Sequence, residues 1–85
     1  MKFCNAIENL RAGEMVQREG WNGKDMFLFQ IDGNQWDFTA DSCGEAANDL
    51  DTMPFICMKT ADNKLVPWLA SQSDVLADDW QIYEE

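Results

Sequence analysis

The sequence has no histidine and only three cysteines, and these shortages exclude much of enzyme and metal chemistry. The cysteines stand at positions 4, 43 and 57 without C-x-x-C spacing, so the usual zinc frameworks cannot form. A nucleophile would need lysine or a carboxylate as its base, and no motif supports such a pair. G-x-G-x-x-G and Walker A loops are also missing. We therefore expect no enzyme, no metal and no cofactor.

Long apolar runs are missing as well. The longest run, residues 26–29, is far shorter than the about 20 residues that a spanning helix needs. We expect no membrane span and no secretory signal. Few, unpaired cysteines fit a reducing cytoplasm.

Basic residues are scarce. Six Lys and Arg face sixteen Asp and Glu, which gives a net charge of −10. Such a charge argues against binding to nucleic acid or anionic lipid. It leaves open an acidic nucleic-acid mimic that blocks a host protein by protein–protein contact, and also a structural subunit of a virion.

Aromatic residues, by contrast, are plentiful: five Phe, four Trp and one Tyr occur in 85 residues. With 46% hydrophobic residues, the chain is too apolar for a disordered tail. Its length fits a single domain spanning residues 1–85. One small core cannot bury this many large apolar side chains. We therefore expect some of them at contacts between subunits of a homo-oligomer.

The hydrophobic pattern predicts an α+β fold, in which a small antiparallel sheet carries one N-terminal helix and one short helix in the C-terminal half. Residues 3–12 have helical periodicity, and Gly13 is the expected left-handed cap. Asn22-Gly23 is a hairpin dipeptide, and Ser71 or Ser73 can cap the short helix, which has room for about two turns. The expected strands are 15–18, 26–31, 35–39, 55–59, 64–68 and 80–83, with turns at 32–34 and 60–63 and a surface loop at 40–52.

Four residues are expected in the core on the basis of this pattern: Cys4 on the first helix, and Trp36, Cys57 and Trp80 in strands. Pro67 lacks a backbone donor, which favours an edge position for its strand.

Residues 18–24 combine the parts of a nucleotide site. Trp21 can stack on a purine, Asn22 can pair with a base edge or a ribose hydroxyl, and Arg18 or Lys24 can neutralise phosphate. The alternative is a hairpin turn flanked by one core Trp.

Residues 68–74 form the second candidate, because a helix start offers free N–H groups beside serine hydroxyls. Asp74 would oppose a phosphate placed directly beside it, so a hydroxyl-rich ligand face fits better there. The alternative is an ordinary capped helix.

The order and spacing of four segments, 3–13, 18–24, 58–62 and 66–80, resemble the second Thoeris anti-defence family of small phage and prophage proteins. The acidic stretch 41–51 departs from that family's pattern.

The resemblance implies a sponge that binds and sequesters a cyclic ADP-ribose isomer (glyco-cyclic ADP-ribose) made by Thoeris TIR proteins, and in some members cyclic dinucleotides, without cleaving it. It also implies a homotetramer with ligand pockets between protomers, in the cytoplasm of the infected bacterial host. Together with the residue chemistry above, it gives the expected ligand-binding residues as Arg18, Trp21, Asn22, Gly23, Lys24, Lys59, Thr60, Trp68, Ser71, Gln72 and Ser73.

Overall fold

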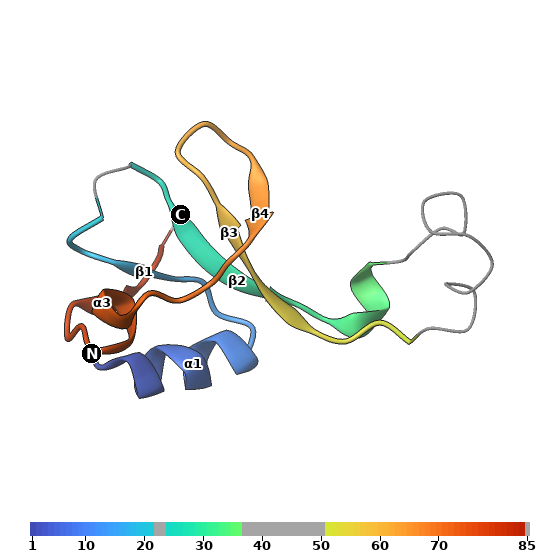
Figure 1. The fold of residues 1–85 in the computed structure, drawn as a ribbon, viewed down its shortest axis with the longest axis horizontal. Coiled ribbons are helices and arrows are strands. Elements are labelled where there is room, and N and C mark those ends of the chain that lie inside the picture. Colours follow the sequence, from blue (N-terminus) through green and yellow to red (C-terminus); the bar gives the residue numbers. More distant parts are fainter. Residues whose placement is uncertain (22–23, 37–50, 85) are drawn as a thin grey trace.

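A five-stranded antiparallel sheet forms the centre of the protein, and a computed structural model describes it over residues 1–21, 24–36 and 51–84 (Figure 1). The strand order is β4-β3-β2-β1-β5. The elements are α1 (Phe3–Arg11), β1 (Val16–Arg18), β2 (Phe27–Ile31), η1 (Gly33–Gln35), β3 (Phe55–Lys59), β4 (Leu65–Pro67), α3 (Gln72–Val75) and β5 (Trp80–Ile82). The predicted α+β fold is therefore confirmed.

Helix α1 covers one face of the sheet (Figure 1). Its Ala6 and Leu10 are fully buried against Val16, Leu28 and Trp80, and these five residues make up the core. The helix ends where Gly13 adopts φ +93°, the left-handed conformation expected from the sequence. Because only this side of the helix is buried, its apolar residues recur in the sequence with helical periodicity.

The core position predicted for Cys4 is wrong, because this residue is exposed. A helix turns 100° per residue, so Cys4 points away from the side on which Phe3 and Ala6 meet the sheet. Cys57, by contrast, is buried as predicted, at 3% exposure.

The register of the strands separates two faces. Val16 lies opposite Leu28 and Leu28 lies opposite Met58, and these residues point toward α1. Alternate residues of the same strands, including Phe27 and Phe29, point to the other face. We call this second surface the open face, because the helix α1 lies on the opposite side (Figure 1).

The strand expected at 35–39 is not found in its described part. Residues 33–35 form the 3-10 helix η1, and Trp36 follows it outside any strand. Both edges of β2 are occupied, by β1 and by β3, so the segment that follows β2 cannot form a hairpin with it. Trp36 is half-buried outside the core, where its Nε1 donates to the Met53 carbonyl at 2.9 Å, so its predicted core position is wrong. Residues 37–39 and the predicted loop as far as residue 50 lie outside the described residues.

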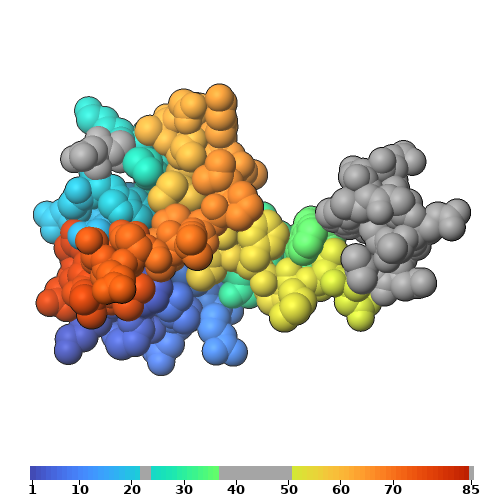
Figure 2. Space-filling view, viewed as in Figure 1, coloured from blue at the N-terminus to red at the C-terminus, as the bar shows by residue number. Residues whose placement is uncertain are grey.

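The C-terminal half follows the prediction closely. The turn 60–63 joins β3 to β4, and Pro67 lies on β4 at the edge of the sheet. Helix α3 is capped by Ser71 but has one turn rather than two, because its C-cap is already at Leu76. Figure 2 shows this segment, orange to red, packed on the N-terminal part of α1 in blue.

Within the described residues, no helix combines the length and the apolar character needed to cross a membrane. In the same part of the chain, no cluster of His, Cys, Asp and Glu side chains is arranged to hold a metal ion.

Candidate functional site

A cluster of aromatic rings connects the two candidate segments. Trp80 is buried, as predicted, and it contacts Trp21 edge to face with the ring centroids 5.5 Å apart. It meets Trp68 in the same way at 6.0 Å, and Phe3 at 5.4 Å. Trp21 and Trp68 are each half-buried and pack against the core. Trp80 thus supports Trp21 from behind.

Arg18 lies between two carboxylates. Its Nη1 donates to Asp74 Oδ1 at 2.8 Å, and its Nε donates to Asp79 Oδ1 at 2.9 Å. The hydrogen bonds to Asp79 and Asp74 raise the pKa of the Arg18 guanidinium. The Arg18 bond and the Gly20 N–H bond lower the pKa of Asp79. Burial raises the pKa of Asp74, but hydrogen bonds from Arg18 and Ser71 outweigh it and the net shift is downward.

Asp74 joins the candidate segments directly. Its carboxylate accepts hydrogen bonds from Arg18 and from both the backbone N and the hydroxyl of Ser71. The Ser71 hydroxyl in turn accepts the Asp74 backbone N–H at 3.1 Å, which completes a capping box. Residues 18–21 and 71–74 are therefore one structural unit, although about fifty residues separate them in sequence.

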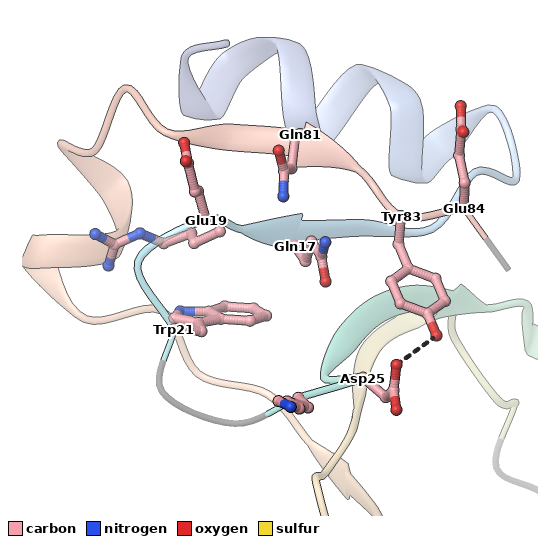
Figure 3. A pocket seen from close by; sticks show the side chains of 9 residues that line it. Gln17, Glu19, Trp21, Asp25, Gln81, Tyr83 and Glu84 are labelled. Atoms are coloured by element: carbon pink, nitrogen blue, oxygen red, sulfur yellow. Dashed lines mark hydrogen bonds between the residues drawn. The ribbon is translucent and has the colours of Figure 1, made fainter.

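An open cavity of about 400 Å³ lies beside this unit on the open face (Figure 3). Three of the predicted residues, Arg18, Trp21 and Lys24, line it. Its other lining residues are Gln17, Glu19, Asp25, Gln81, Tyr83 and Glu84. Sequence reasoning missed these six.

The floor of the cavity is polar. Gln17 of β1 and Gln81 of β5 are direct cross-strand partners, so their amides lie side by side between Trp21 and Tyr83 (Figure 3). Each amide offers two N–H donors and one carbonyl acceptor, a set that matches ribose hydroxyls or a base edge. The Tyr83 ring stacks on Phe27 with centroids 4.5 Å apart. Strand alternation in the sequence could have placed these residues on one face of the sheet, but their meeting in one cavity also depends on the β1–β5 pairing.

The lining of the cavity carries more acidic than basic side chains. Lys24 and Arg18 stand against Glu19, Asp25 and Glu84, and the charge of Arg18 is already shared with Asp74 and Asp79. Lys24 is exposed. Phosphate groups would therefore meet positive charge at the Lys24 end, whereas the Trp21 end suits an uncharged part of a ligand.

Other predicted residues lie outside this cavity. The Lys59 Nζ donates to the Asp25 backbone carbonyl at 2.9 Å and lies 6.0 Å from the Phe27 ring centroid, so it flanks the same turn from the β3 side. The Thr60 hydroxyl bonds within its own turn, to Asp62 at 2.5 Å. Gln72 and Ser73 are exposed on α3. Asn22 and Gly23 lie outside the described residues.

Comparison with known proteins gives two matches. A model of the Thoeris anti-defense 2-like domain family matches residues 1–83. The protein "Thoeris anti-defense 2" of Bacillus phage SP01 is 48% identical over 84 residues, which cover 96% of this chain and 93% of the phage protein.

Proposed function

The chain belongs to the Thoeris anti-defense 2-like family, and on this premise we propose that it counters Thoeris defence by binding and sequestering a cyclic ADP-ribose isomer, with cyclic dinucleotides as further ligands. One observation carries the proposal: Asp74 joins the two candidate segments beside an open cavity that has Trp21 on one wall and paired amides on its floor. Stacking and hydroxyl recognition then lie within reach of one small molecule.

In this proposal, each chemical part of the ligand contacts a different part of the site. Its base stacks on Trp21, because stacking on an aromatic ring contributes about 1–3 kcal/mol per base. Its ribose hydroxyls bond to the Gln17 and Gln81 amides. Its phosphates lie toward Lys24, with Lys59 on the other side of the same turn. The remaining proposed contacts are Arg18, Asn22, Gly23, Thr60, Trp68, Ser71, Gln72 and Ser73.

We propose binding without cleavage. The chain has no histidine to act as a general base. Arg18 and the carboxylates of Asp74 and Asp79 are tied up in hydrogen bonds with one another, which suits a rigid frame better than proton transfer. A sponge needs no bond to break, because lowering the free concentration of the signal is enough, and its place of action is the cytoplasm in which the signal is made.

We further propose that the protein is a homotetramer assembled through the open face. Phe27, Phe29 and the 60% exposed Leu65 lie on this face, whose strand residues include no acid. In a chain of net charge −10, these strand residues give two copies an apolar contact without acids, and Glu19, Asp25 and Glu84 lie beside it at the cavity. A second copy would also add a wall to the open cavity.

Light scattering tests the assembly at micromolar concentration. Wild type should have the mass of four chains, and Leu65→Glu should lower it. Leu69→Glu makes the same charge change at a residue that is 92% exposed beyond β4, and it should leave the mass unchanged. A wild-type mass of one chain would contradict the proposal.

Calorimetry against a panel of cyclic ADP-ribose isomers and cyclic dinucleotides tests the function. We expect stoichiometric binding of at least one isomer, and full recovery of the intact ligand after the protein is denatured. Trp21→Ala should weaken binding by about 1–3 kcal/mol through lost stacking. Trp36→Ala is the matched control, because this half-buried Trp lies away from the cavity.

Two results would contradict the proposal: no binding across the panel, or unchanged affinity in a folded Trp21→Ala protein. Salt-sensitive binding to a basic protein, with no nucleotide binding, would favour the acidic mimic instead.

A further inference from the structure

The turn that precedes Trp21 is bonded at three points to a single residue, Asp79, which lies directly before β5. Asp79 Oδ1 accepts a hydrogen bond from Arg18 Nε at 2.9 Å, and Oδ2 accepts the Gly20 backbone N–H at 2.8 Å. The Asp79 backbone carbonyl accepts the Glu19 N–H at 3.0 Å. One residue of the C-terminal segment therefore holds three consecutive residues of the turn by one hydrogen bond each.

This turn brings Trp21 to the cavity. The Trp21 backbone N–H bonds to the Arg18 carbonyl at 3.3 Å, and the Trp21 side chain then forms one wall of the cavity (Figure 3). Trp80, the residue after Asp79, meets the Trp21 ring edge to face and is also the direct β5 partner of Arg18. Asp79 thus holds the backbone that carries Trp21, and its neighbour in the sequence limits the position of the ring.

Asp79 itself is not part of the cavity wall. Arg18, Glu19 and Trp21 line the cavity, whereas Asp79 does not. Its side chain is 30% exposed, and both carboxylate oxygens accept hydrogen bonds from within the protein. A free carboxylate here would also repel the phosphates of a cyclic nucleotide, so direct contact with the ligand is unfavourable.

We propose that Asp79 is a positioning residue of the ligand site: its bonds to residues 18–20 hold Trp21 where a base can stack on it, and it makes no ligand contact of its own. This inference rests on the function proposed above. A turn that is ordered before the ligand arrives loses less conformational entropy on binding, so the ligand is bound more tightly without a new contact.

Asp79→Asn separates positioning from charge, because the two predict opposite results. The amide can accept a bond from Arg18 or from Gly20 only with its NH₂ facing the other donor, so the turn loosens. We expect the best ligand of the panel to bind about two- to tenfold more weakly, as when one large side chain must be ordered on binding. If Asp79 acted only through its charge, losing a carboxylate and releasing Arg18 would strengthen the binding of an anionic ligand.

Asp78→Asn is the matched control. It removes an equal charge at the exposed neighbouring residue, and it should not weaken binding. A double-mutant cycle then tests whether Asp79 acts through Trp21. In a Trp21→Ala background, Asp79→Asn should have almost no further effect on affinity, because the side chain that it positions is missing.

Gly20→Ala tests the same bond from the other side. The added Cβ would lie 2.9 Å from Asp79 Oδ2, so the carboxylate has to move away although its charge is kept. We expect weaker binding in this variant as well. In an Asp79→Ala background the methyl group meets no carboxylate, and Gly20→Ala should have little further effect.

A measurement on the free protein separates this inference from the proposed function. The chain has four Trp indole N–H groups, whose signals can be resolved by ¹⁵N NMR, and the Trp21 signal is identified by its loss in Trp21→Phe. Asp79→Asn should shift the Trp21 signal, and Asp78→Asn should not. The signal of Trp36, whose indole is bonded to the Met53 carbonyl away from the cavity, should stay in place in both variants.

If wild type binds no cyclic nucleotide, the proposed function fails, whereas a Trp21 signal that shifts in Asp79→Asn still supports the positioning role. Three results would overturn that role: an unmoved Trp21 signal in Asp79→Asn, unchanged or tighter binding by the folded variant, or an equal loss of affinity with and without Trp21. If Asp79→Asn does not fold, Gly20→Ala takes its place, and unchanged affinity together with an unmoved Trp21 signal overturns the role.

Discussion

Replacing Trp80 with Phe measures how much of the fold depends on the ring behind the candidate site. The indole is 2% exposed and lies among Phe3, Trp21 and Trp68. Phe keeps a six-membered ring but loses the buried five-membered ring, which costs about 1–3 kcal/mol in transfer free energy and cavity. The lost bond from Nε1 to the Asp74 carbonyl costs about 1 kcal/mol more. That carbonyl keeps the Ala77 N–H at 3.3 Å, so no acceptor is stranded.

The sum is about 2–4 kcal/mol, against a total stability of roughly 5–10 kcal/mol for a domain of this size. The melting temperature should fall by roughly 8–32 °C, because each kcal/mol corresponds to about 4–8 °C in small domains. Circular dichroism during heating, at one fixed protomer concentration, measures this shift.

Trp36→Phe is the matched control. The Trp36 indole also donates to a carbonyl, that of Met53, and also meets a ring edge to face, that of Phe55 at 5.4 Å, but it is half-buried outside the core. Its loss should cost about 1 kcal/mol. Equal shifts in the two variants would refute the claim that Trp80 anchors the core.

Two further predictions concern acid and the helix cap. The pKa values of Asp74 and Asp79 are lowered in the fold, so both groups contribute stability above their unfolded pKa of about 3.9, which is lost as pH falls through the lower folded values. The free energy of unfolding, measured by urea titration, should therefore fall below about pH 4. Asp79→Asn should make this fall smaller, and an unchanged slope of the free energy against pH would contradict the prediction. Gly13→Ala should cost about 1–2 kcal/mol, because φ +93° strains an L residue although the added methyl group meets no atom within 4 Å. Gly13→Asn should lose less, and equal losses would speak against this backbone origin.

The fold was predictable wherever the signal is local. Helical periodicity and a glycine cap located α1, and turn residues located β3, β4 and α3 within a residue or two. The strand start expected at residues 35 and 36 is wrong, because alternation reports one half-buried face and does not reveal which sheet edges are free. The order β4-β3-β2-β1-β5 brings the last strand beside the first, which no local pattern encodes.

The residues of the candidate site also fall into two groups, those predictable from the local sequence and those brought together only by tertiary structure. Trp21, Arg18 and Lys24 could be named from one short segment, and the structure places all three on one cavity. Gln17 and Gln81 could not, because they are neighbours only through the β1–β5 register. The role of Asp74 as a partner of Arg18 could not be predicted either, since this bond depends on tertiary packing.

These contacts also explain how a chain of net charge −10 could hold an anionic ligand. Two acids are used within the protein itself: Asp74 and Asp79 are bonded to Arg18, so their charge is compensated before any ligand arrives. Lys24 lines the cavity next to Asp25, and Lys59 is bonded to the Asp25 carbonyl. Because the cationic end and the stacking end are separate, phosphates and base need not compete for one place.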